Sequence, residues 1–261
     1  MPVIPHSIPI LEYDSDPTAL LRHDRNQEIV LPKKAVYAFL GNTIDDYAQA
    51  VGAEILDVFH TIGRDTNIYR ISHKGEELCL CRAPLGGPAA VQLMDWLIGH
   101  GVRSVITAGS CGALAPLPEN AFLIPERALR DEGTSYHYLP PARFVELSPV
   151  AVQVIREVLQ ARGLHAASCT TWTTDGFFRE TESMVRHRRE EGCLTVEMEC
   201  ASLAACAQFR GALFGQLLYT ADSLAYAKNY DERSWGEDSL EPALELCLDI
   251  AIKMPLEVLY D

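Results

Sequence analysis

Carboxylates in apolar surroundings are the groups of this chain best placed to do chemistry. Glu197 and Glu199 stand on either side of Met198 in the segment TVEMECASLAACA (195–207), where almost every other residue is small or apolar. Acidic side chains are rarely buried unless something pairs with them. The two glutamates therefore predict a partner group at the start of what resembles a core helix.

Asp222 is a third such carboxylate, at the end of the apolar segment LLYTAD (217–222). Partial burial at that place raises the pKa of a carboxyl group. A general acid that works near neutral pH needs a raised pKa. Aspartate is also a favoured helix N-cap, and the residue taken by itself favours that interpretation.

The segment AGSCG (108–112) resembles the G-x-S-x-G nucleophile elbow of hydrolases, with alanine in the first place. An elbow needs a helix directly after its serine, here Ser110. The residues that follow include Pro116 and Pro118, which oppose a helix, and His187 lies in a charged helical segment. We instead expect a glycine-containing turn at a strand end, whose N–H groups and hydroxyl can bind an anion or a sugar.

The segment TTDGFFRE (173–180) combines a predicted strand end, a turn, two aromatic residues and two charges. Phe177 and Phe178 can both be core residues. Alternatively, one of them stacks on a flat ligand while Arg179 or Glu180 contacts its polar edge. The segment alone leaves both interpretations open.

The elements that position these residues are alternating strands and helices. Such alternation predicts an α/β fold with a mixed sheet covered on both faces, and ligands in such folds bind beyond the strand ends. The proline within 122–129 predicts an edge strand or a bend. The expected strands are 35–41, near 55–60, 67–72, 77–83, 102–109, 122–129, 166–176 and 212–222. The expected helices begin near Thr43 and after Pro88, or cover 149–163, 198–209 and 240–259, the last interrupted near Pro255.

Composition limits the classes of function. The chain has 261 residues, 48% of them hydrophobic, which is enough for one domain; we expect it over residues 35–261, after an N-terminal arm and lead-in over 1–34. A net charge of −14 argues against nucleic-acid binding. The sequence shows neither a secretory signal nor an apolar segment long enough to span a bilayer, so we expect a cytoplasmic protein. Its eight cysteines lack metal-site spacing, so we expect buried thiols and no metal.

Four segments in order, GSCGAL, TTDGFF, VEMECASLAA and TADSLA, together resemble the nucleoside phosphorylase family. That family includes purine nucleoside phosphorylase, uridine phosphorylase and the methylthioadenosine/S-adenosylhomocysteine nucleosidases. The likeness runs from about residue 37 to 225. It implies the three-layer phosphorylase/hydrolase-like fold and cleavage of the N-glycosidic bond of a small-molecule nucleoside. Because active sites in the family borrow residues across subunits, it also implies a homo-oligomer, a dimer or a hexamer.

The resemblance gives the paired glutamates a role. In the family, the second glutamate of V-E-M-E holds the ribose hydroxyls and the methionine packs against the sugar. These residues would be Glu199 and Met198, with Glu197 close by. A histidine that reaches a neighbouring subunit's sugar would be His23, with His6 as the alternative.

The base would be held by residues of two of these segments. Phe177 would stack on it, while Cys111 and Gly112 would line its site. Arg179 and Glu180 are the candidates for its polar edge.

Asp222 matches the aspartate that protonates a purine at N7 in purine-cleaving members. Cleavage of the C–N bond leaves an anionic base, so protonating that base lowers the barrier. The segments RDEGTSYHY (130–138) and LGGP (85–88) instead resemble the uridine phosphorylase branch. We give Asp222 more weight because it bears on the chemistry directly, and we favour a purine-type substrate.

The phosphate site departs from the family pattern. Ser110 would contact phosphate or sugar, but the G-D-P-x-R loop reads Gly41-Asn-Thr-Ile-Asp45, with an acid in place of arginine, and Thr107 occupies a second arginine position. Arg64 and Arg82 are the candidate replacements. Each lost contact is worth about 1.5–3 kcal/mol as a charge-assisted hydrogen bond. The acceptor is therefore inorganic phosphate or water, with no other cofactor expected, and a non-catalytic nucleoside-binding protein is the alternative.

Overall fold

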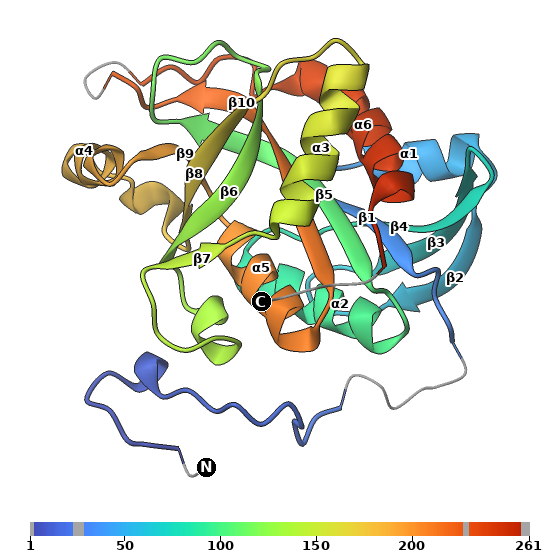
Figure 1. Cartoon of the computed structure of the whole chain (residues 1–261), viewed down its shortest axis with the longest axis horizontal. Helices are drawn as coiled ribbons and strands as arrows, with labels where there is room; N and C mark the ends of the chain where they lie inside the picture. The colour runs from blue at the N-terminus through green and yellow to red at the C-terminus, as the bar shows by residue number, and fades with distance from the viewer. Residues whose placement is uncertain (1–2, 23–28, 227–229, 257–261) are drawn as a thin grey trace.

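The fold is built on one mixed sheet of ten strands. The computed structural model describes residues 3–22, 29–226 and 230–256 (Figure 1). The strand order is β10-β6-β8-β9-β5-β1-β4-β3-β2, and β7 pairs with β6. Because β10 also pairs with β5, the strands β5, β10, β6, β8 and β9 form a closed ring. The strands are β1 (Lys34–Ala38), β2 (Glu54–Phe59), β3 (Thr66–His73), β4 (Glu76–Arg82), β5 (Ser104–Ala113), β6 (Phe122–Asp131), β7 (Phe144–Glu146), β8 (Ala167–Thr174), β9 (Cys193–Glu197) and β10 (Leu213–Ser223).

Helices cover both faces of the sheet. Helices α3 and α6 pack together over β5 and β10, while α2 packs with α5 on the other side (Figure 1). The α-helices are α1 (Thr43–Ala50), α2 (Gly87–Gly99), α3 (Pro149–Ala161), α4 (Glu182–Glu190), α5 (Cys200–Arg210) and α6 (Leu240–Lys253). Short 3-10 turns are η1 (Pro9–Leu11), η2 (Thr134–His137), η3 (Phe177–Arg179) and η4 (Glu237–Ser239). The predicted α/β class with a central mixed sheet is confirmed.

Small residues allow α2 and α5 to approach closely. A Cβ at Gly87, the first residue of α2, would stand 2.5 Å from Ser202 Oγ on α5. Most of α5 is buried because its residues from Cys200 to Ala207 are small or apolar. This close contact places the beginnings of both helices side by side, next to the ends of β5 and β10.

The predicted turn at 109–112 was wrong. Strand β5 continues to Ala113, and Gly109 and Gly112 are extended residues that allow close packing. A Cβ at Gly109 would stand 3.3 Å from Phe39, and one at Gly112 would stand 2.8 Å from Leu224. The glycines are needed because neighbouring segments approach the strand, and the chain does not reverse there.

Three other elements bear on the expectations drawn from the sequence. Of the two alternatives for 122–129, the edge strand is wrong and the bend is supported, because β6 is an inner strand with a bulge between Pro125 and Arg127 that absorbs the missing N–H of proline. The predicted interruption of the last helix near Pro255 is confirmed, since α6 ends at Lys253, and residues 257–259 lie outside the described ranges. Strand β9, which leads directly into the two glutamates, was not predicted, because it is short.

The N-terminal segment lies outside the sheet. Residues 3–22 run extended along one side of the molecule, and η1 approaches η2 (Figure 1). Arg210 Nη1 donates to the carbonyl of Pro17 at 2.8 Å. Within the described ranges, no helix has the length and apolar character needed to cross a membrane.

Candidate active site

A cavity of about 400 Å³ opens where the C-terminal parts of β5, β9 and β10 meet. Residues from the four segments that together resemble the family line it. They include Ser110, Cys111 and Gly112 from β5; Phe177, Phe178 and Glu180 around η3; Glu197, Met198 and Glu199 between β9 and α5; and Asp222 on β10. Phe39, Leu85, Gly109, Val196, Gln216, Ala221 and Trp235 complete the lining.

Glu197 uses its carboxylate to hold the local structure. Its Oε2 accepts the backbone N–H of Glu199 at 2.7 Å and of Cys200 at 2.6 Å, at the start of α5. Its Oε1 accepts the hydroxyls of Thr173 at 2.6 Å and Thr171 at 3.3 Å on β8. Burial raises the pKa of Glu197, and these four hydrogen bonds oppose that rise. A carboxylate offers about four acceptor sites, so its capacity is filled by the protein.

Glu199 lies beside the cavity, and its carboxylate has hydrogen-bond acceptor sites that the protein does not fill. Its Oε1 accepts the N–H of Gly86 at 2.6 Å, and its side chain is otherwise enclosed, with the residue 6% exposed. Burial, followed by the nearby charge of Glu197, raises the pKa of Glu199 to about 8. Met198 is half-buried between the two glutamates. The turn held by Glu197 therefore presents Met198 and Glu199 to a ligand.

Asp222 lies within β10 and caps no helix, so the N-cap interpretation was wrong. The residue is 6% exposed, and burial raises its pKa, while a hydrogen bond from Tyr230 and the charge of Arg233 oppose that shift. A Cβ at Gly112 would stand 3.3 Å from Asp222 Oδ1. The absence of a side chain at Gly112 thus keeps the carboxyl open to the cavity.

Aromatic residues surround Asp222 and Glu180. A second hollow of about 560 Å³ shares Phe177, Phe178, Glu180, Asp222 and Trp235 with the first. Phe177 and Phe178 meet edge to face, with ring centroids 5.1 Å apart. Burial, then the charge of Asp222, raises the pKa of Glu180 to about 7. Both phenylalanines line the site, so the interpretation of the pair as core is wrong.

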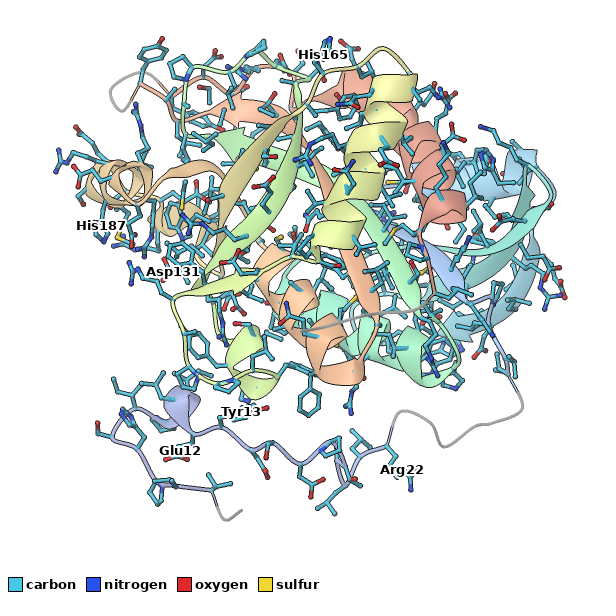
Figure 2. All side chains as sticks on the ribbon, in the orientation of Figure 1. Glu12, Tyr13, Arg22, Asp131, His165 and His187 are labelled. Carbon is cyan, nitrogen blue, oxygen red and sulfur yellow. The ribbon has the colours of Figure 1, made fainter. Side chains whose placement is uncertain are left out.

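Ser110 faces the cavity but does not form a nucleophile elbow. It lies inside β5, next to Tyr219 of β10 in register, and its hydroxyl shares a hydrogen bond with the Tyr219 side chain. His187 lies on α4, at the outer edge of the molecule in Figure 2. Because Ser110 lies within a continuous strand and His187 lies on the distant helix α4, the nucleophile elbow and the serine–histidine pair of a serine hydrolase are not formed by these residues.

Residues 33–252 match the family described as the Phosphorylase superfamily. The chain belongs to this superfamily. A guanosine phosphorylase of Halorubrum lacusprofundi is 26% identical over 200 residues, which are 74% of this chain and 80% of that protein. A DeoD-type purine nucleoside phosphorylase of Bacillus cereus is 25% identical over 190 residues, 70% of this chain and 78% of that protein. The AMP nucleosidase of Bacteroides thetaiotaomicron has the same fold, with a TM-score of 0.69 at 24% identity over 85% of this chain and 89% of its own.

Membership of the superfamily confirms the predicted family, the fold and the enzyme class. The predicted cleavage of a nucleoside N-glycosidic bond is confirmed at the level of the family, with purine nucleosides favoured among the relatives. No comparison tests the role of an individual residue. Those roles stay predictions, and the geometry shows which of them are brought together.

Of the residues predicted to bind phosphate, Ser110 lines the cavity, and Gly41, Arg64 and Arg82 do not. Arg64 Nη2 contacts Asp45 Oδ2 at 3.2 Å, and Tyr69 donates to Asp45 Oδ1 at 2.9 Å. Arg82 Nη1 donates to Asn42 Oδ1 at 2.8 Å. Gly41 begins the same loop, in the left-handed conformation with φ +58°. Asp45 thus takes the place of an external anion beside Arg64.

The predicted residues Arg179 and His6 are not among those that line the cavity. Arg179 is exposed on η3 and does not line either hollow. His23 lies outside the described residues. His6 is exposed in the N-terminal segment, where its ring contacts the carbonyl of Ile8 at 3.1 Å.

The segment RDEGTSYHY (130–138), which resembles the uridine branch, is used for structure. The buried Glu132 accepts the hydroxyl of Ser202 at 2.6 Å and the N–H of Ser135 at 2.9 Å. Arg130 donates to Ser135 Oγ at 2.8 Å. This network ties η2 to α5, behind the glutamates of the cavity.

Several lining residues were missed from the sequence, namely Phe39, Leu85, Val196, Gln216, Ala221 and Trp235. Only Trp235 carries a signal that could have been used, since a large aromatic residue in a polar segment (NYDERSWGED) is often a ligand contact. Over the ranges that the structure describes, no group of three or more His, Cys, Asp or Glu residues is arranged to hold a metal ion.

Proposed function

We propose that this enzyme cleaves the N-glycosidic bond of a purine nucleoside, with Asp222 as the general acid that protonates the leaving base. The observation that carries the proposal is the shared cavity: the desolvated carboxyl of Asp222 and the Glu199–Met198 turn line the same space of about 400 Å³. A nucleoside has a hydroxyl-rich end and an aromatic end, and the two ends of this cavity match them.

Glu199 and Met198 hold the ribose. The Glu199 carboxyl keeps acceptor capacity beyond its bond with Gly86, and a sugar hydroxyl can donate to it or accept from it. The pKa of about 8 allows both protonation states near neutral pH. Glu197 does not contact the sugar in this proposal, because its four hydrogen bonds position Glu199 instead.

The base lies among aromatic residues. Phe177 stacks on it, Cys111 and Gly112 form the wall beneath it, and Glu180 contacts its polar edge. A partly protonated carboxyl can donate to a ring nitrogen or accept from an amino group, so Glu180 with a pKa of about 7 suits a purine edge.

Bond cleavage follows from these positions. As the bond from C1′ to the base nitrogen breaks, its electron pair goes to the base and positive charge develops on the sugar. Asp222 delivers its proton to the base, so the leaving group departs neutral. Burial keeps Asp222 protonated to a higher pH than an exposed aspartate, which provides the proton for this step.

The test is the variant Asp222→Asn, which keeps the shape of the side chain and removes its acidic proton. Loss of a general acid is expected to lower kcat by about 10²–10⁴-fold. Base release from inosine, guanosine and adenosine would be followed by chromatography, with uridine as the pyrimidine comparison. In the wild type, kcat should fall as pH rises through the raised pKa, and the variant should lack that dependence. Wild-type turnover in Asp222→Asn would refute the assignment.

We also propose that the protein works as a homo-oligomer in the cytoplasm. Eight buried free cysteines support a reducing compartment. Light scattering on the purified protein measures the mass in solution, and a monomeric mass would contradict the first part of this proposal.

A further inference from the structure

The charges around the cavity bear on what accepts the sugar. Among the described residues that line it, four are carboxylic acids and none is Lys, Arg or His; the acids are Glu180, Glu197, Glu199 and Asp222. A phosphate dianion is normally held by arginine forks or by backbone N–H groups, and nearby carboxylates repel it. A neutral acceptor meets no such repulsion.

The nearest arginine candidates are already engaged. Arg64 contacts the Asp45 carboxylate, and Arg82 donates to the Asn42 amide. Burial lowers the pKa of Arg82, the nearby charge of Arg64 lowers it as well, and the charge of Asp45 opposes both. Neither arginine lines the cavity of its own chain.

Gln216 adds a polar group that the protein does not satisfy. It lies on β10 with 1% of its surface exposed, it lines the cavity, and its buried Oε1 lacks a hydrogen-bond partner among the described residues. In register beside it on β5 is Thr107, whose hydroxyl donates at 3.5 Å to the carbonyl of Gly215. A buried amide oxygen without a donor costs free energy, so an unsatisfied one inside a ligand cavity indicates a ligand that donates.

We propose that the acceptor is water, bound at the inner wall of the cavity by the Gln216 carbonyl, which makes this enzyme an N-glycoside hydrolase. Water can donate to Gln216 Oε1, and it brings no charge among the four acids. The inference rests on the proposed function, since it names the second substrate of that same site.

The reaction balances without another reactant. The water oxygen bonds to C1′ as the C1′–N bond breaks, and the electron pair of that bond goes to the base. Asp222 gives its proton to the base. The proton that water loses passes to solvent, from which Asp222 is protonated again. The products are free ribose and the neutral base.

The experiment uses the full chain with inosine and guanosine in phosphate-free buffer, with and without added inorganic phosphate. Chromatography measures the free base, and mass spectrometry and ³¹P NMR distinguish ribose from ribose 1-phosphate. We expect free ribose in both buffers, at a rate that phosphate leaves unchanged. Ribose 1-phosphate, or a rate that requires phosphate, would overturn the inference and leave the proposed function intact. Release of base in neither buffer would overturn both.

Variants test the role of Gln216 itself. Gln216→Leu keeps a side chain of similar size and removes the amide carbonyl. We expect kcat to fall at least about tenfold, with KM little changed. Gln208→Leu, on α5 outside the cavity, is the matched control and should keep wild-type kcat. Equal turnover of Gln216→Leu and the wild type would show that Gln216 does not hold the acceptor. The products of the wild type decide between water and phosphate even if Gln216→Leu fails to fold.

Discussion

Replacing Glu197 tests whether it stabilises the start of α5, while the neighbouring Glu199 binds the ligand. Glu197→Ala removes the acceptor of two buried N–H groups, those of Glu199 and Cys200, and of two threonine hydroxyls. The hydroxyls can rotate to other partners, but the N–H groups cannot. Each buried N–H left without a partner costs about 1–3 kcal/mol, so the two together cost about 2–6 kcal/mol of unfolding free energy. That is a large part of the ~5–15 kcal/mol that keeps a typical domain folded.

The matched control is Glu199→Ala. Glu199 accepts the N–H of the half-exposed Gly86, which water can replace, and the backbone N–H of the adjacent Met198 also lowers its pKa. We therefore expect a stability loss of at most about 1 kcal/mol, together with a large loss of kcat/KM because the ribose is no longer held.

Thermal unfolding and steady-state kinetics measure the two effects. At roughly 2–4 °C per kcal/mol for a domain of this size, Glu197→Ala should lower Tm by on the order of 10 °C, and Glu199→Ala by a few degrees at most. A Glu197→Ala protein with wild-type Tm and lost activity would refute the reasoning, because it would mean that Glu197 contacts the ligand and does not hold α5.

Two further predictions concern packing and pH. Gly112→Ala puts a Cβ within 3.0 Å of Leu224 and Val196 and close to Asp222, so we expect a loss of about 1–3 kcal/mol in denaturant unfolding and reduced kcat. In the control Gly63→Ala the added Cβ stands 3.9 Å from Thr61 Oγ1, an ordinary contact distance, so neither quantity should change. Unchanged stability of Gly112→Ala would show that β5 is not closely packed there. The pKa of Glu180 in the folded protein is about 7, above its ordinary value of 4.5. Between these values the folded protein holds a proton that the unfolded chain releases. The free energy of unfolding therefore falls as pH rises from about 5 to 8. Glu180→Gln should therefore have a flatter dependence of Tm on pH than the wild type, and equal slopes would contradict the shift.

Much of the fold could be predicted because its elements are encoded locally. The apolar runs of β1, β4 and β10 and the amphipathic pattern of α3 need no information from distant residues. The apolar pattern misled where it was too short, as at β9.

The turn predicted at 109–112 was wrong because long-range packing keeps this part of β5 extended. Glycine predicts a turn unless something presses against the chain, and Phe39 and Leu224, which press against this strand, are far from it in sequence.

The sequence by itself determined which groups can do chemistry here: the Glu197–Met198–Glu199 segment, Asp222 at a strand end, and an acid at Asp45 in place of arginine. The tertiary structure decided what each group does. Two neighbouring glutamates are equivalent in a sequence, but the threonines of β8 fill the capacity of one and leave the other free for a ligand. The Gln216 carbonyl, which has no hydrogen-bond partner among the described residues, depends in the same way on the pairing of β10 with β5, which joins residues more than a hundred positions apart. Hydrogen-bond capacity and burial depend on neighbours in space, and for these residues the neighbours come from distant parts of the chain.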